Sequence, residues 1–120
     1  MCAQIRRKSG LWYSAKYSTF SISDEVGKYR LTVAGYSGDA GDAMAVQEIP
    51  TGISNGMMFS TPDSDNDIHP DKHCANDYNR GWWDMYCSYS VLNRDRWARW
   101  RFSTFTAADI DTSRMLIKLS

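Results

Sequence analysis

Alternating apolar and polar side chains predict a β-hairpin in the first third of the chain. Residues 17–22 alternate aromatic or aliphatic side chains with serine and threonine, and residues 28–34 place Tyr29, Leu31 and Val33 on one side. A period of two is typical of strands that bury one face. The segment between them, Ser-Asp-Glu-Val-Gly, is rich in turn-forming residues. The pattern therefore predicts two antiparallel strands joined by a short turn.

Outside this hairpin the pattern is weaker. Residues 1–11 are polar and basic, which predicts a loose lead-in, and the glycines of residues 35–42 predict a loop. Later segments predict, in order, a helical turn at 43–47, an Asn-Gly turn at 55–56, a short strand at 57–59 and a closing strand at 114–119. Residues 61–80 contain almost no apolar side chain, so an interaction other than core packing must hold them.

Within this polar stretch, residues 63–67 read Asp-Ser-Asp-Asn-Asp. Carboxylates at alternate positions of an extended loop can converge on one hard cation, and oxygen ligands suit calcium. The similarity to an EF-hand loop ends after five residues, because Ile68 stands in place of glycine and Cys74 in place of the bidentate glutamate. A solvated acidic turn without metal is the alternative interpretation.

Two cysteines flank the next part of the chain. A disulfide between Cys74 and Cys87 would stabilise the fold by roughly 3 kcal/mol through loop closure. The alternative is a zinc site made by His69, His73 and the same two cysteines. Adjacent His73 and Cys74 are poorly spaced for one tetrahedral ion and no C-x-x-C pair is present, so the disulfide is favoured. A disulfide implies an oxidising compartment, whereas Cys2 has no evident partner.

Composition narrows the function. The chain has 120 residues, enough for one domain, and its 14 basic and 14 acidic side chains give no net charge. This balance argues against binding to a nucleic-acid backbone or an anionic membrane, and no apolar run is long enough to cross a bilayer. The sequence contains no phosphate-binding glycine loop, G-x-S-x-G elbow or H-E-x-x-H helix, so an enzyme is not favoured.

The aromatic residues allow two interpretations. The chain has five Trp and seven Tyr. A group of four tryptophans could form a sugar-stacking platform, but burial in the core is the more common role of such residues; they are Trp82, Trp83, Trp97 and Trp100. Tyr78 and Tyr86 lie in or beside the polar stretch and are better ligand candidates, because tyrosine offers both an apolar ring and a hydroxyl.

Taken in the order in which they occur along the chain, the motifs of this sequence resemble those of fibrinogen C-terminal-like domains. The resemblance covers about residues 12–119 and is carried by Lys28-Tyr29-Arg30-Leu31, Gly35-Tyr36-Ser37-Gly38, Ala40-Gly41-Asp42-Ala43, Asn55-Gly56-Met57, Phe59-Ser60-Thr61, residues 63–67, Cys74-Ala75, Gly81-Trp82-Trp83, Cys87, Leu92-Asn93, the Trp97 and Trp100 pair and Met115. Only the C-terminal half of the family's domain is represented. The family implies an α+β fold, with a small twisted antiparallel sheet, a short helix and a loop-rich calcium- and ligand-binding subdomain.

The resemblance also implies subdomain bounds. Residues 12–45 would form part of the central sheet, 46–112 the calcium- and ligand-binding subdomain, and 113–120 the strand that returns to the sheet. The family consists of secreted, non-enzymatic recognition modules, including pattern-recognition lectins of innate immunity. The basic residues after Met1 leave no signal-peptide core, so a secreted protein would need a longer precursor.

By the same resemblance, Asp65 and Asp67 are the calcium carboxylates, and the backbone carbonyls of His69 and Asp71 complete the coordination shell. The ligand pocket maps to Tyr78, Tyr86, Cys87 and Ser88, with a cis peptide bond between Tyr86 and Cys87. Ser88 stands where the family usually has histidine, and the loop between Asn93 and Trp97 is shorter than in relatives.

Two functions from different classes follow. The first is a calcium-stabilised recognition module for acetylated glycans or other acetylated surface ligands. The second is a truncated or degenerate segment that binds calcium but serves in assembly, through a protein partner or self-association at an unfinished sheet edge. A third possibility, a cytosolic zinc protein, requires that the two cysteines remain unpaired.

Overall fold

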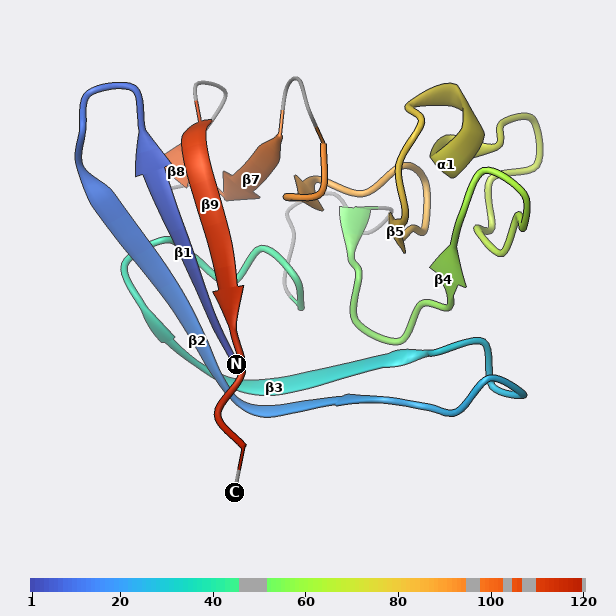
Figure 1. The fold of residues 1–120 in the computed structure, drawn as a ribbon, viewed down its shortest axis with the longest axis horizontal. Coiled ribbons are helices and arrows are strands. Elements are labelled where there is room, and N and C mark those ends of the chain that lie inside the picture. The colour runs from blue at the N-terminus through green and yellow to red at the C-terminus, as the bar shows by residue number, and fades with distance from the viewer. Residues whose placement is uncertain (46–51, 95–97, 103–104, 107–109, 120) are drawn as a thin grey trace.

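A computed structural model describes residues 1–45, 52–94, 98–102, 105–106 and 110–119. A four-stranded sheet stands on one side of the molecule, and a loop-rich region with two smaller sheets and a short helix packs beside it (Figure 1). This combination confirms the predicted α+β class with little helix. No helix within the described ranges is long and apolar enough to cross a membrane.

The main sheet has the strand order β3-β2-β1-β9. Its strands are β1 (Cys2–Arg7), β2 (Trp12–Ile22), β3 (Leu31–Gly38) and β9 (Ile110–Leu116), and all neighbours are antiparallel. The β2–β3 pair confirms the predicted hairpin, with Phe20 opposite Val33. The predicted closing strand is also present, although it starts earlier and ends at Leu116.

The prediction of a loose lead-in over residues 1–11 is wrong, because β1 lies inside the sheet between β2 and β9. Ala3 and Ile5 are fully buried, whereas Gln4 and Arg6 lie on the other face. The alternation is short and embedded in basic residues, so its burial depends on tertiary pairing that local sequence does not reveal.

The predicted glycine loop over residues 35–42 is wrong in its first half, because Gly35 to Gly38 complete β3. Gly38 has φ of 128°, and a Cβ atom there would lie 2.2 Å from the carbonyl oxygen of Ser14. The glycine therefore permits a backbone approach that no other residue could make without displacement.

The loop-rich region contains short elements. These are β4 (Phe59–Ser60), α1 (Cys74–Asp77), β5 (Trp82–Trp83), β6 (Ser90–Val91), β7 (Arg99–Phe102) and β8 (Phe105–Thr106). β4 pairs with β5, and β7 pairs with both β6 and β8. The predicted Asn55-Gly56 turn is confirmed by a bond from Met57 N to Ser54 O of 3.0 Å. The predicted strand at 57–59 is displaced to Phe59–Ser60.

The predicted helical turn at 43–47 corresponds to a turn at residues 43–45, and residues 46–47 lie outside the described residues. The α-helix among the described residues is α1, which the sequence pattern did not predict. The subdomain bounds at 46–112 and 113–120 remain predictions.

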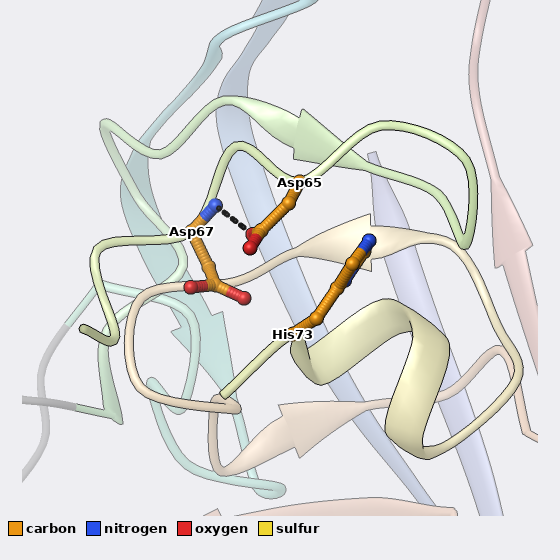
Figure 2. Close-up of side chains that lie close together, drawn as sticks. All are labelled: Asp65, Asp67 and His73. Atoms are coloured by element: carbon orange, nitrogen blue, oxygen red, sulfur yellow. Dashed lines mark hydrogen bonds between the residues drawn. The ribbon is translucent and has the colours of Figure 1, made fainter. Parts of the chain in front are cut away.

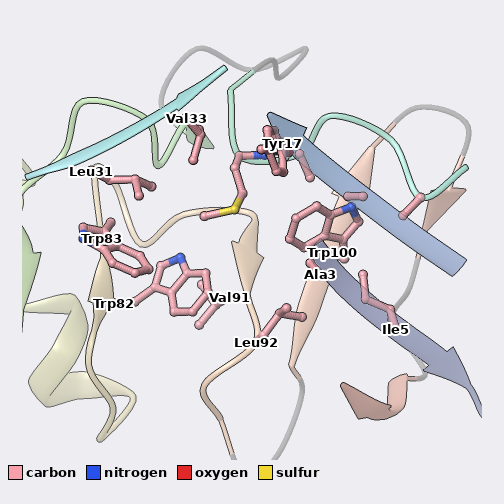
Figure 3. Packing of buried hydrophobic residues seen from close by; sticks show 14 residues of the cluster. Ala3, Ile5, Tyr17, Leu31, Val33, Trp82, Trp83, Val91, Leu92 and Trp100 are labelled. Carbon is pink, nitrogen blue, oxygen red and sulfur yellow. Dashed lines mark hydrogen bonds between the residues drawn. The ribbon is translucent and has the colours of Figure 1, made fainter. Parts of the chain in front are cut away.

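One core joins the sheet to the loop-rich region (Figure 3). Trp82, Trp83 and Trp100 are buried at 3%, 9% and 0% exposure, which confirms the core interpretation for these three, while Trp97 lies outside the described residues. Trp100 Nε1 donates to Gly41 O at 3.0 Å, so its polar atom is satisfied. Trp12 differs, because 44% of it is exposed on the sheet.

Candidate metal and ligand site

The acidic segment is a tight turn fastened to the rest of the fold by Asn66. Thr61 and Ser64 exchange backbone hydrogen bonds, which reverses the chain. The Asn66 side chain donates to Phe59 O at 2.9 Å and accepts from Lys28 Nζ at 2.8 Å. Its backbone N–H donates to Ser60 Oγ at 2.9 Å. These bonds fix the turn beside β4, although the segment buries no core side chain of its own.

Beside this turn, ligand atoms of Asp65, Asp67 and His73 lie within 4.8 Å of one another (Figure 2). The two carboxylates come from alternate positions of the loop, and His73 comes from the residue that precedes α1. Asp63 lies outside the group, since its carboxylate accepts from Thr61 Oγ1, a bond that lowers its pKa. The loop therefore concentrates two of its three aspartates, and the fold adds a histidine.

Asp67 is the best-anchored member of the cluster. Its carboxylate accepts from the backbone N–H groups of His69 and Cys74, each at 2.9 Å. Burial raises its pKa, the two backbone bonds oppose that shift, and the neighbouring charge of Asp65 adds to it. A bound cation would relieve this repulsion. The arrangement can therefore hold a divalent ion: the carboxylates suit calcium, whereas the imidazole suits a transition metal better.

A buried ion pair lies close enough to Asp65 and Asp67 for their negative charges to affect its carboxylate. Arg80 donates to both carboxylate oxygens of Asp84, at 2.6 and 2.9 Å, and Asp84 is fully buried. Burial raises the pKa of Asp84, Arg80 opposes that shift, and the charges of Asp67 and Asp65 reinforce it. The negative charge of the site thus extends inward, and Arg80 compensates it.

The predicted disulfide is confirmed. Cys74 and Cys87 are bonded, with their Cα atoms 5.1 Å apart. The bond joins the first residue of α1 to the segment that follows β5. Neither sulfur is available as a zinc ligand, so the four-residue zinc site of the sequence analysis does not form.

The expected cis peptide bond before Cys87 is absent, and the described part of the chain contains no cis peptide. Cys87 instead adopts φ of 58°, in the left-handed region. Ser88 is only 1% exposed, and its hydroxyl donates to Trp83 O at 3.1 Å. Ser88 therefore links the segment after the disulfide to β5 through a buried hydrogen bond. The predicted contact of Ser88 with a ligand stays a prediction.

Tyr86 and His69 lie together. Their ring centroids are 4.6 Å apart, and Tyr86 is 38% exposed. His69 Nδ1 accepts from the N–H of Asp71 at 3.2 Å, which links the two residues proposed to supply carbonyl ligands. One of the predicted pocket tyrosines thus packs directly on the acidic loop.

Tyr78 has different neighbours. The guanidinium of Arg94 lies 4.6 Å from its ring centroid and that of Arg80 lies 5.5 Å away. Tyr78 is half-buried at the end of α1. The contacts of Tyr78 and Tyr86 are therefore separate: Tyr78 contacts arginines, and Tyr86 contacts His69, which follows the acidic run.

The sequence predicted the disulfide, which is confirmed, and placed Asp65 and Asp67 in one acidic site, but it did not predict the positions of His73, Arg80, Asp84 and Arg94. His73 entered only as a zinc candidate, and its place beside the aspartates depends on how the chain returns to α1. Arg80 and Asp84 show i,i+4 spacing, which could have suggested a pair, although not its burial. The contact of Arg94 with Tyr78 leaves no local signal.

Comparison with known proteins assigns the family. The family model described as "Fibrinogen beta and gamma chains, C-terminal globular domain" matches residues 1–113. A techylectin-like protein of Phoneutria nigriventer is 42% identical over 79 residues, covering 66% of this chain and 32% of that protein. The fibrinogen-like globe domain of human ANGPTL6 superposes with a TM-score of 0.72 at 25% identity, covering 98% of this chain and 56% of that one.

A third similar protein was solved with a bound peptide. Lamprey fibrin D-dimer, solved with the peptide Gly-His-Arg-Pro-amide, superposes with a TM-score of 0.69 at 31% identity, covering 77% of this chain and 31% of that one. The chain spans about a third or less of the length of the curated relatives that it matches. Because the family model covers nearly all of the sequence, the chain belongs to the family of fibrinogen C-terminal globular domains.

Proposed function

We propose that this chain is part of a secreted, calcium-stabilised recognition module that binds acetylated glycans or similar surface ligands. Its family supports a non-enzymatic recognition role, and the lectin-like relative supports a carbohydrate ligand. The observation that carries the calcium proposal is the convergence of Asp65 and Asp67. Two neighbouring carboxylates repel each other, and a cation bound between them removes that repulsion. The disulfide supports secretion.

In this proposal the ion is structural. Asp67 accepts from the N–H of Cys74, so an ion held by Asp65, Asp67 and the carbonyls of His69 and Asp71 would fix the start of α1. The disulfide carries that restraint to Cys87, between Tyr86 and Ser88. Tyr78 follows α1, and the ion therefore shapes both sides of the proposed pocket without touching the ligand.

Calcium is expected to raise the melting temperature of the wild-type protein. If only the folded state binds, the added stability is about 2.7 kcal/mol at a calcium concentration of 100 times Kd. Combining Asp65→Asn with Asp67→Asn should abolish the response, while Asp63→Asn, outside the cluster, should retain it. Differential scanning calorimetry after chelation and calcium readdition measures this. An unchanged response in the double variant would place the ion elsewhere.

His73 separates calcium from a transition metal. His73→Ala should leave most of the calcium response, because calcium prefers oxygen ligands. A cluster selective for zinc or nickel, which favour imidazole ligands, would lose its metal response in the same variant.

Retention on immobilised N-acetylglucosamine tests the ligand part of the proposal. Folded wild-type protein should be retained when calcium is present and released by a chelator, and Tyr78→Ala should pass through. A folded, calcium-responsive protein that is not retained would contradict the acetylated ligand and favour the second function.

The second function, a contact with another protein chain, is favoured by the free edge of β9. No described strand pairs with the outer side of β9. A cavity of about 340 Å³ adjoins this edge, and its walls are mainly apolar; they include Phe59, Trp82, Trp83, Leu92 and Met115. A strand added to β9 could place an apolar side chain in this cavity. The proposed occupant is β9 of a second copy, since the exposed Leu116 and Ile117 continue the same edge.

Self-association through β9 should be visible by sedimentation velocity as a concentration-dependent dimer. Ser113→Glu introduces a charge at the cavity wall and should give a monomer. Thr112→Glu, on the opposite face of the same strand, is the matched control and should still dimerise. A wild-type monomer at every accessible concentration would contradict this function.

A further inference from the structure

The outer face of the main sheet carries an exposed tryptophan among basic side chains. Ala3 and Ile5 point into the core, so Gln4 and Arg6 lie on the opposite side of β1. The strand register places Trp12 beside Arg6. It places Arg114 beside Gln4 on the other flank. We call the surface formed by Gln4, Arg6, Trp12, Ser14 and Arg114 the Trp12 face.

The indole of Trp12 is flanked by two guanidinium groups. Arg114 lies 4.9 Å and Arg6 lies 5.6 Å from the ring centroid. These cation–π contacts hold the ring in place, yet 44% of Trp12 remains exposed. An ordered, accessible indole is a surface on which a flat apolar ligand face can stack.

The Trp12 face is positively charged although the whole chain is neutral. Arg6 is paired with Asp111, an exposed ion pair that neutralises one charge. Arg114 donates through Nε to the neutral Gln4, and exposed Lys16 lies two residues beyond Ser14 along β2. The carboxylate of Asp39 also lies beside this face, because it accepts from the N–H of Ser14 at 2.7 Å. Three basic side chains against these two aspartates leave the face with a net positive charge, which favours an anionic ligand.

A polar cavity of about 150 Å³ adjoins the indole, lined by Gln4, Trp12, Tyr13, Ser14 and Arg114. It presents amide, hydroxyl and guanidinium groups next to an aromatic ring. That combination matches a sugar that carries hydroxyls and an anionic substituent: the C–H face packs on the indole, and a sulfate or carboxylate meets the planar donors of Arg114.

We propose that the Trp12 face binds an acidic polysaccharide, a chain of sulfated or carboxylated sugars. The ring of one sugar stacks on Trp12, its anionic group pairs with Arg114, and a neighbouring anionic group lies toward Lys16. None of these side chains belongs to the Asp65, Asp67 and His73 cluster, so this binding needs no calcium.

Surface plasmon resonance on immobilised heparin tests the proposal with the wild-type chain in the presence of a chelator. We expect saturable binding that weakens as salt increases. Trp12→Ala and Arg114→Gln should each weaken binding about tenfold or more. Lys72→Gln removes the same charge from an exposed residue just before α1. It is the matched control and should change binding less than twofold. Circular dichroism confirms that each variant is folded.

Three results would overturn the proposal. One is the absence of heparin binding by folded wild-type protein. Another is equal weakening by Lys72→Gln and Arg114→Gln, with Trp12→Ala unaffected, which would reduce the interaction to net charge. The third is binding to polyglutamate or single-stranded DNA as tight as to heparin, which would make the partner an acidic peptide or a nucleic acid.

Discussion

Arg80→Met is expected to lower the free energy of unfolding by about 3–5 kcal/mol, the usual cost of removing one partner from a buried ion pair. Arg80 and Asp84 are 6% and 0% exposed, and the two hydrogen bonds between them are the strongest compensation for the buried carboxylate. Without Arg80, Asp84 would be left in a site whose burial already raises its pKa. Urea denaturation measures the loss.

The pH dependence gives a second readout of this variant. A carboxyl group whose pKa is higher in the folded than in the unfolded state destabilises the fold once it ionises. The deficit of Arg80→Met should therefore grow as pH rises from about 4, the unfolded pKa of aspartate, through the folded pKa of Asp84. A deficit that is flat with pH would show that packing, not charge, is what Arg80 contributes.

A double variant provides the control. Arg80→Met combined with Asp84→Leu replaces the pair with apolar side chains and should recover most of the lost stability. Recovery would identify the uncompensated carboxylate as the cause. Failure of the double variant to improve on Arg80→Met would mean that the network around Asp67 and Tyr78 needs the pair itself.

Removing the disulfide should lower the free energy of unfolding by about 3 kcal/mol, because the bond closes a loop between two cysteines 13 positions apart in sequence. The effect should concentrate on α1, a four-residue helix that cannot persist by hydrogen bonding alone. Cys74→Ser with Cys87→Ser, compared with wild type by urea denaturation, measures the cost. Cys2→Ser, which changes the unpaired cysteine of β1, should shift stability by less than about 0.5 kcal/mol.

The same double variant tests whether the stability of the fold is coupled to the proposed calcium site. Asp67 accepts from the N–H of Cys74, so loosening Cys74 should weaken the calcium response as well as the fold. If the serine variant keeps the full calcium response at lower stability, then the loop and α1 are independent, and the indirect role proposed for calcium is wrong.

The sequence was informative where one local pattern decided the structure. The β2–β3 hairpin follows from a period of two, and the acidic run at 63–67 and the cysteine pair follow from residue type and spacing. Asp65 and Asp67 were singled out within that run by the family resemblance. Strand β1 escaped because only Ala3 and Ile5 mark its buried face among basic residues, and pairing with β9 supplies the rest. Helix α1 escaped because His73 and a disulfide, not apolar periodicity, define it.

For the candidate site, the sequence predicted the kind of residues involved but not which side chains lie next to them. The acidic residues predicted a cation site, whereas the position of His73 beside Asp65 and Asp67 depends on the path of residues 68–72. In the same way, Tyr78 was predicted as a pocket residue, but its contacts with Arg80 and Arg94 were not predicted. Contacts of this kind arise from tertiary packing, which no sequence window contains.

The position of β1 also bears on how the polypeptide acquires its shape. Its second neighbour, β9, is more than a hundred residues away, with Cys2 opposite Leu116. During synthesis, one edge of β1 therefore stays unpaired until most of the segment up to β9 has been made. Contacts between residues so far apart in sequence slow folding and prolong the exposure of apolar surface and unpaired strand edges, a situation in which chaperones limit aggregation.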